Sequence, residues 1–169
     1  MSREVRRVPA NWQHPKNAGG YYKPLYPGEW FEQLVTEWDE GNAKWSEGFR
    51  ECYSGQADWV AHTKADGETY EDFAGPRPVL EDYMPDWSDM ERTHWMMYES
   101  VSEGTPISPA FATPQELCRW LVDNKASAFA DQTASYDAWW AVCQEGSSVG
   151  SAALTTDGEW ISGAEALLR

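Results

Sequence analysis

Long apolar runs, cysteines and basic residues are all scarce in this chain of 169 residues. No apolar run approaches the roughly 18–20 residues that a membrane-spanning helix needs. Residues 1–10 are basic but are not followed by the apolar stretch of a signal peptide. The three cysteines, Cys52, Cys118 and Cys143, form no Cys-x-x-Cys pair, so neither a disulfide framework nor a zinc site is expected. We therefore expect no membrane contact, no metal and a reducing compartment such as the cytoplasm.

Acidic residues outnumber basic ones, 28 Asp and Glu against 13 Lys and Arg, for a formal charge of −15 at pH 7. Such a charge repels phosphates, so we expect no direct binding to bare nucleic acid. Glycine-rich loops of the Walker, Rossmann and kinase types are missing as well, which argues against nucleotide-driven chemistry. The sequence therefore predicts no cofactor.

Aromatic residues, in contrast, are abundant: the chain has 11 Trp, 8 Tyr and 5 Phe. This is more buriable surface than a disordered acidic tail carries, so a folded core is expected. The charge is uneven, with a net +4 over residues 1–28, −14 over residues 29–103 and −5 over residues 104–169. We predict a basic extended arm over residues 1–28 that lies on a single compact domain over residues 29–169.

Apolar residues at helical spacing predict four short helices, over residues 30–41, 88–101, 113–121 and 135–146. Capping boxes, a Ser or Thr followed three residues later by Glu, begin the second and third helices. Gly41 ends or weakens the first helix unless Lys44, Trp45 and Phe49 continue it. Asp-Gly turns predict two hairpins, of residues 59–64 with 68–73 and of residues 149–154 with 159–162. The expected fold class is α+β, with short helices and short antiparallel hairpins.

Two local patterns match catalytic motifs without their context. Residues 146–150 read Gly-Ser-Ser-Val-Gly, but a nucleophile elbow needs a strand before its serine and a helix after it, and the predicted order is reversed. Glu91 and His94 have the Glu-x-x-His spacing of carboxylate-bridged metal sites, which use that motif twice. Adjacent acids such as Asp39 and Glu40 are expected to be solvated rather than catalytic. We therefore predict no catalytic residue and no enzyme activity.

The tryptophans are the most unusual feature of the composition. Four of them are expected in the core: Trp30, Trp38, Trp120 and Trp139. Five others lie beside acids or other aromatics, so some should reach the surface: Trp45, Trp59, Trp87, Trp95 and Trp140. Exposed tryptophan is a preferred anchor of protein interfaces, because it buries a large area at a low cost in entropy.

Six phrases of the chain stand out: REVRRVP at 3–9, WQHPK at 12–16, EWDEGN at 37–42, AGPRP at 74–78, DYMP at 82–85 and SEGTPISP at 102–109. With them the chain resembles a family of small proteins of tailed bacteriophages and prophages. The likeness runs from the N-terminus to about Trp140, and the tail after Gln144 is more individual. The resemblance implies a phage protein in the bacterial cytoplasm of the host, and it implies no catalytic residue. Small accessory phage proteins often antagonise host defences, an association that does not come from the residues themselves.

We predict a non-enzymatic inhibitor of a host antiviral defence system, similar in action to anti-CRISPR or anti-restriction proteins. Its partner would be a nuclease or another nucleic-acid-binding subunit, and the carboxylates would occupy the surface of that partner that normally binds phosphates. The predicted acidic contact residues are Glu37, Asp39, Glu40, Asp82, Asp86 and Asp89. The predicted aromatic anchors are Trp45, Trp87 and Trp95.

Three alternatives stay open. A protein that sequesters a cyclic-nucleotide or ADP-ribose-type signal would stack the base on Trp or Tyr and hold phosphates with the few available arginines, Arg6, Arg7, Arg77 and Arg92. A virion or assembly component would be found in purified particles, and an enzyme of unrecognised type would show turnover. The sequence also leaves a homodimer open.

Overall fold

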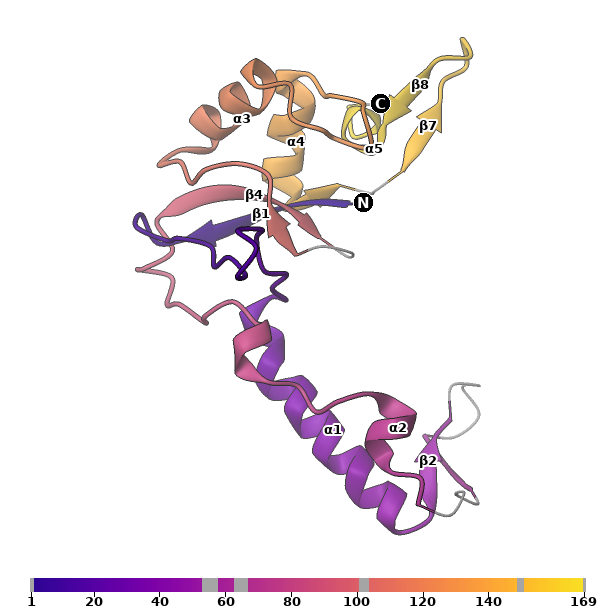
Figure 1. Ribbon diagram of the computed structural model, residues 1–169. Coiled ribbons are helices and arrows are strands. Elements are labelled where there is room, and N and C mark those ends of the chain that lie inside the picture. Colours follow the sequence, from indigo (N-terminus) through magenta and orange to yellow (C-terminus); the bar gives the residue numbers. More distant parts are fainter. Residues whose placement is uncertain (1, 53–57, 63–66, 101–103, 149–150, 169) are drawn as a thin grey trace. The chain divides into compact units, whose positions relative to one another are not determined.

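The computed structural model describes residues 2–52, 58–62, 67–100, 104–148 and 151–168 (Figure 1). Contacts within the chain divide it into two units. We call residues 1–25 with 87–169 the terminal unit, and residues 26–86 the acidic unit. Both contain helices and short antiparallel strands, which confirms the predicted α+β class. The predicted boundary at residue 28, with one domain after it, differs from this division.

The terminal unit is built on an antiparallel sheet with the strand order β5-β4-β1-β6. Strand β1 (Ser2–Val8) pairs on one side with β4 (His94–Ser100) and on the other with β6 (Ser147–Ser148). Strand β5 (Thr105–Pro106) pairs with the far edge of β4. The prediction of an arm is therefore wrong for the first residues of the chain. They form an inner strand of the sheet, because β4 pairs along the whole of β1 on one side and β6 pairs with Arg3 and Glu4 on the other.

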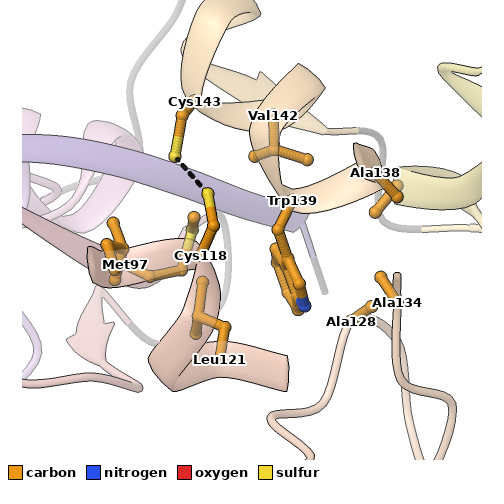
Figure 2. Close-up of a cluster of buried hydrophobic side chains, with 11 residues drawn as sticks. Met97, Cys118, Leu121, Ala128, Ala134, Ala138, Trp139, Val142 and Cys143 are labelled. Atoms are coloured by element: carbon orange, nitrogen blue, oxygen red, sulfur yellow. Dashed lines mark hydrogen bonds between the residues drawn. The ribbon is translucent and has the colours of Figure 1, made fainter. Parts of the chain in front are cut away.

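Helices α3 (Pro114–Asp123) and α4 (Tyr136–Glu145) cover one face of this sheet (Figure 1). The buried core beneath them contains Met97, Cys118, Leu121, Trp139 and Val142 (Figure 2). Within it the thiols of Cys118 and Cys143 lie 3.7 Å apart, as free cysteines. Trp139 is fully buried, which confirms one of the four tryptophans expected in the core.

Local signals predicted the start of both core helices and the end of α4. Thr113 and Glu116 form a reciprocal capping box at the start of α3. At the start of α4, the Ser135 hydroxyl accepts a hydrogen bond from the Ala138 backbone amide. Gly146 ends α4 in a left-handed conformation that glycine adopts without strain. The predicted C-terminal hairpin is also confirmed: it consists of β7 (Ala152–Leu154) and β8 (Trp160–Ser162), followed by α5 (Gly163–Ala166).

The acidic unit is organised around helix α1 (Phe31–Ser46), which follows the 3-10 turn η1 (Gly28–Trp30). Four further elements complete the unit: β2 (Phe49–Glu51), β3 (Trp59–Ala61), α2 (Tyr70–Ala74) and the 3-10 turn η2 (Leu80–Asp82). Its aromatic core forms where Trp45 lies 4.0 Å from His62 and 5.0 Å from Phe73, measured between ring centroids.

Two predicted elements are wrong. The helix expected over residues 88–101 is instead a short turn followed by strand β4. The hairpin strand expected over residues 68–73 is instead helix α2, which a capping box of Thr69 and Asp72 begins. Strand β3 pairs with β2 rather than with that segment, and the Asp-Gly turn expected between them falls partly outside the described residues.

Candidate functional site

The negative charge of the chain is concentrated in the acidic unit. Residues 26–86 contain 15 Asp and Glu and four Lys and Arg, a net charge of −11. The terminal unit contains 13 acidic and nine basic residues, a net charge of −4. The smaller unit therefore holds most of the formal charge of −15.

Helix α1 exposes carboxylates along its length. Five exposed acids lie on it and at its end: Glu32, Glu37, Asp39, Glu40 and Glu47. From Glu32 to Glu47, at 1.5 Å of rise per residue, they extend over about 22 Å, with a mean axial spacing of about 5.6 Å. The phosphates of one DNA strand are spaced about 3.4 Å apart along the duplex axis. The carboxylates of the helix are thus spaced about 1.6 times as widely as the phosphates of one strand, and Arg77 and Lys44 offset two of them.

Several of these carboxylates are held by neighbouring side chains. The Arg77 guanidinium donates two hydrogen bonds of 2.8 Å to the Asp39 carboxylate. This bidentate contact lowers the pKa of the Asp39 carboxyl below its usual value, so that group stays ionised. Lys44 Nζ lies 2.9 Å from Glu47 Oε2, and Gln33 Nε2 donates to Glu37 Oε1 at 2.7 Å. The contact of Arg77 also ties the segment after α2 to the outer side of α1.

Apolar side chains are exposed at the start of α1. The exposed fraction is 58% for Tyr26, 51% for Trp30 and 61% for Leu80. The Tyr26 amide donates to the Asp82 carbonyl at 2.9 Å, and the Tyr26 ring lies 5.5 Å from the Tyr83 ring. This contact joins the segment before η1 to the one that contains Leu80. We call Tyr26, Trp30 and Leu80 the apolar end of the acidic unit.

Six of the nine predicted contact residues belong to the acidic unit. Glu37, Asp39 and Glu40 are exposed on α1, Asp82 is half-buried in η2, and Asp86 is exposed at the end of the unit. Trp45 was predicted to be a surface anchor, and this is wrong. It is only 4% exposed, because it fills the aromatic core between α1 and α2.

The other three predicted contact residues belong to the terminal unit. Asp89 is exposed and lies 3.2 Å from Arg92. Trp87 and Trp95 are half-buried: the first packs edge-on against Trp12, and the second lies beneath the Arg7 guanidinium. The nine residues therefore do not form one surface within either unit.

Sequence reasoning missed Trp30, an exposed tryptophan of the acidic unit. Trp30 was expected in the core but is 51% exposed, because it belongs to the 3-10 turn before α1 rather than to the buried face of the helix. Trp38 and Trp120 are half-buried, and the Trp38 indole donates to the Gly75 carbonyl at 3.0 Å. The Pro27-Gly28 pair before Trp30 is a signal that could have shifted the predicted start of the helix.

Within the described residues, no group of three or more His, Cys, Asp or Glu side chains could hold a metal ion. No helix in the described part of the chain is long and apolar enough to cross a membrane. Comparison of the chain with protein-family models, with curated proteins and with solved structures finds no match. The resemblance to phage proteins therefore depends on the six sequence phrases alone.

Proposed function

We propose that this protein acts by binding, with helix α1 of the acidic unit presenting carboxylates to a positively charged, nucleic-acid-binding surface of another protein. By its resemblance to phage proteins, the chain would inhibit a bacterial defence protein of this kind, such as a nuclease or its nucleic-acid-binding subunit. The protein would occupy the surface that normally contacts phosphates and would not turn over a substrate.

The observation that carries this proposal is the unequal charge of the two units, −11 against −4. General solubility does not require acids to gather in one unit of 61 residues. A row of carboxylates steers a basic partner during encounter and sets the orientation of the complex. Affinity comes from desolvated anchors, and the apolar end of the acidic unit supplies an exposed tryptophan and tyrosine for that role.

Affinity capture from a bacterial lysate tests the proposal when it is combined with charge-matched variants. The test variant is Glu32→Gln with Glu40→Gln, which removes two exposed carboxylates from α1. The control is Asp123→Asn with Glu145→Gln, which removes two exposed carboxylates from the ends of α3 and α4. We expect the wild type and the control to retain the same nucleic-acid-binding protein, which the test variant loses.

Duplex DNA then distinguishes a specific complex from general charge attraction. The captured protein should be released from the wild type by added duplex DNA at unchanged ionic strength, because both ligands use one basic surface. Equal retention by the wild type and both variants would contradict the proposal. So would a partner that binds DNA and this protein at the same time.

A phage-plating assay tests the inhibition of defence directly. Cells that restrict a phage through a DNA-targeting system should become permissive when they express the wild type or the control variant. The α1 variant, at equal expression, should leave restriction intact. Unchanged plating with the wild type, across cells that carry different nucleic-acid-targeting systems, would rule out the assignment to host defence.

A further inference from the structure

The terminal unit holds an open pocket of about 560 Å³, separate from the residues on which the proposed function depends. Residues 10–22 and 106–110 contribute most of its lining, together with Met96 of β4 and Trp120 of α3. The aromatic and charged side chains of the lining are Trp12, His14, Lys16, Tyr22 and Trp120. A volume of this size lies within the range of about 300–1,000 Å³ that is usual for small-molecule sites.

A chain of hydrogen bonds fixes one wall of the pocket. The Trp12 indole donates to the Tyr98 hydroxyl at 3.1 Å, and that hydroxyl lies 3.1 Å from His14 Nδ1. His14 Nε2 lies 2.7 Å from the Lys23 carbonyl, which can only accept, so Nε2 carries the hydrogen and Nδ1 accepts from Tyr98. Both ring nitrogens of His14 are thus engaged, and the histidine positions the wall instead of contacting a ligand through a nitrogen.

A tight turn places the charged residue of the pocket beside an aromatic ring. The Asn17 side-chain oxygen accepts hydrogen bonds from the backbone amides of Gly19 and Tyr21. The backbone amide of Asn17 donates to the Tyr21 carbonyl. The turn brings Lys16 opposite Tyr22, with Lys16 Nζ 4.9 Å from the centroid of the Tyr22 ring. The ammonium group and the exposed phenol ring therefore lie together at the pocket.

The charge of the lining differs from that of the rest of the protein. Among the lining residues that the structure describes, Lys16 is basic and none is acidic, although the chain has 28 acids and 13 bases. Because the described lining has no carboxylate to pair with a positive charge, the pocket favours an anionic ligand over a cationic one. Trp12, Tyr22 and Trp120 contribute aromatic side chains to the lining, and such side chains accommodate a flat heteroaromatic group.

From this combination we infer that the pocket binds a small planar heteroaromatic anion of the nucleoside monophosphate class, with the ring between the aromatic side chains and the anionic group on Lys16. One ammonium matches one phosphate group as a point-charge contact. The pocket provides no second described basic side chain, so a single phosphate suits it better than a diphosphate.

Isothermal titration calorimetry with three probes tests this assignment on the full chain. Adenosine 5′-monophosphate carries both the ring and the phosphate, adenosine carries only the ring, and ribose 5-phosphate carries only the phosphate. We expect one molecule of adenosine 5′-monophosphate per chain, about tenfold weaker binding of adenosine, and no measurable binding of ribose 5-phosphate.

Two substitutions separate the contributions of charge and ring. Lys16→Gln should weaken adenosine 5′-monophosphate about tenfold and leave adenosine unchanged, because only the phosphate contact is lost. Lys125→Gln, which removes an exposed lysine outside the pocket lining, is the matched control and should change neither affinity. Tyr22→Leu should weaken both ring-bearing probes, since the aromatic face is replaced by an alkyl group of lower polarizability.

The inference is overturned if none of the probes binds at millimolar concentration while circular dichroism shows folded protein. It is equally overturned if Lys16→Gln and Lys125→Gln have the same effect, or if Tyr22→Leu binds both ring-bearing probes as well as the wild type does. Ribose 5-phosphate binding as tightly as adenosine 5′-monophosphate would show an anion site without ring recognition and would also reject it. Because the assay uses only the terminal unit's pocket, its failure leaves the proposed function of the acidic unit untouched.

Discussion

At the scale of single residues, the buried polar cluster around Tyr98 holds residues 9–25 against the sheet. Tyr98 is fully buried, and burial raises the pKa of its hydroxyl to about 12. Arg6 lies 4.6 Å from the centre of the Tyr98 ring and donates to the Leu25 carbonyl. The face of β1 and β4 opposite the helices is therefore closed by a segment that has no regular secondary structure of its own.

Replacing Tyr98 by phenylalanine should destabilise the terminal unit by about 1–3 kcal/mol. The substitution keeps the ring but leaves the Trp12 indole and His14 Nδ1 without their shared partner, and buried unpaired groups carry a cost of that size. Tyr21→Phe is the matched control, because Tyr21 is 76% exposed. Urea denaturation measures both, and equal stability of the two variants would contradict the proposed importance of the cluster.

Acid should weaken the same cluster. Burial lowers the pKa of the His14 imidazole, the Lys23 carbonyl partly offsets this, and the charge of Arg6 lowers it further. Below about pH 6.5 the unfolded chain takes up a proton that the folded chain does not, so stability should fall as the pH falls. Above about pH 7.5 this contribution should be constant.

The pH dependence can be assigned to His14 by substitution. His14→Gln should flatten the loss of stability between pH 7 and pH 5, whereas His94→Gln, outside the cluster, should keep it. Urea denaturation at a series of pH values gives the slope, which one group limits to about 1.4 kcal/mol per pH unit. An unchanged slope in His14→Gln would show that other groups cause the acid sensitivity.

At the scale of elements, one of the two capping boxes found in the sequence begins a helix and the other does not. The box at Thr113 correctly begins α3, and the Ser135 hydroxyl caps the start of α4. Half of the Ser88 box also forms, with the Ser88 backbone amide 3.0 Å from Glu91 Oε2, but the Glu91 amide bonds to the Ser88 carbonyl and closes a single turn. Residues 95–98 of β4 are then covered on both faces, and a continuous apolar run fits a helix and a buried strand equally.

The candidate surface was predicted in part for a similar reason. Acidic residues on α1 could be found from sequence, because a carboxylate on a helix is exposed unless something covers it. The burial of Trp45 and the exposure of Trp30 could not be found from the sequence, since both depend on tertiary partners. Trp45 meets His62 and Phe73, whereas Trp30 lies in a turn that the periodicity assigned to the helix.

Gly41 shows how one tertiary contact reverses a local rule. In the middle of an exposed helix, replacing glycine by alanine stabilises by about 1 kcal/mol. A Cβ at Gly41 would lie 2.0 Å from the Tyr70 hydroxyl oxygen and 2.4 Å from Cζ of that ring. We therefore expect Gly41→Ala to destabilise the acidic unit by about 1–3 kcal/mol.

Asn42→Ala, at the exposed neighbouring position of α1, is the control and should be neutral or slightly stabilising. Thermal unfolding followed by circular dichroism compares the two variants. A higher melting temperature for Gly41→Ala would show that α1 and Tyr70 do not approach as closely as described. In that case the intrinsic preference of a helix for alanine over glycine would decide the effect of the substitution.

At the scale of the whole molecule, the two units differ in charge far more than in architecture. Self-repulsion within the acidic unit, with its net charge of −11, should be screened by salt more strongly than in the terminal unit. Raising sodium chloride from 10 to 300 mM should slow amide hydrogen exchange in α1 more than in α3 and α4. The same protection gained in all three helices would show that the charge asymmetry has no energetic consequence.

The central claim is that the carboxylates of α1 act in place of phosphates, and the salt dependence of partner binding tests it most directly. The affinity of the wild type for the captured partner should fall linearly with the logarithm of salt concentration. The slope should be shallower for Glu32→Gln with Glu40→Gln and unchanged for Asp123→Asn with Asp131→Asn, in which both replaced acids are exposed in the terminal unit. An affinity that is independent of salt, or the same slope in all three proteins, would contradict the account.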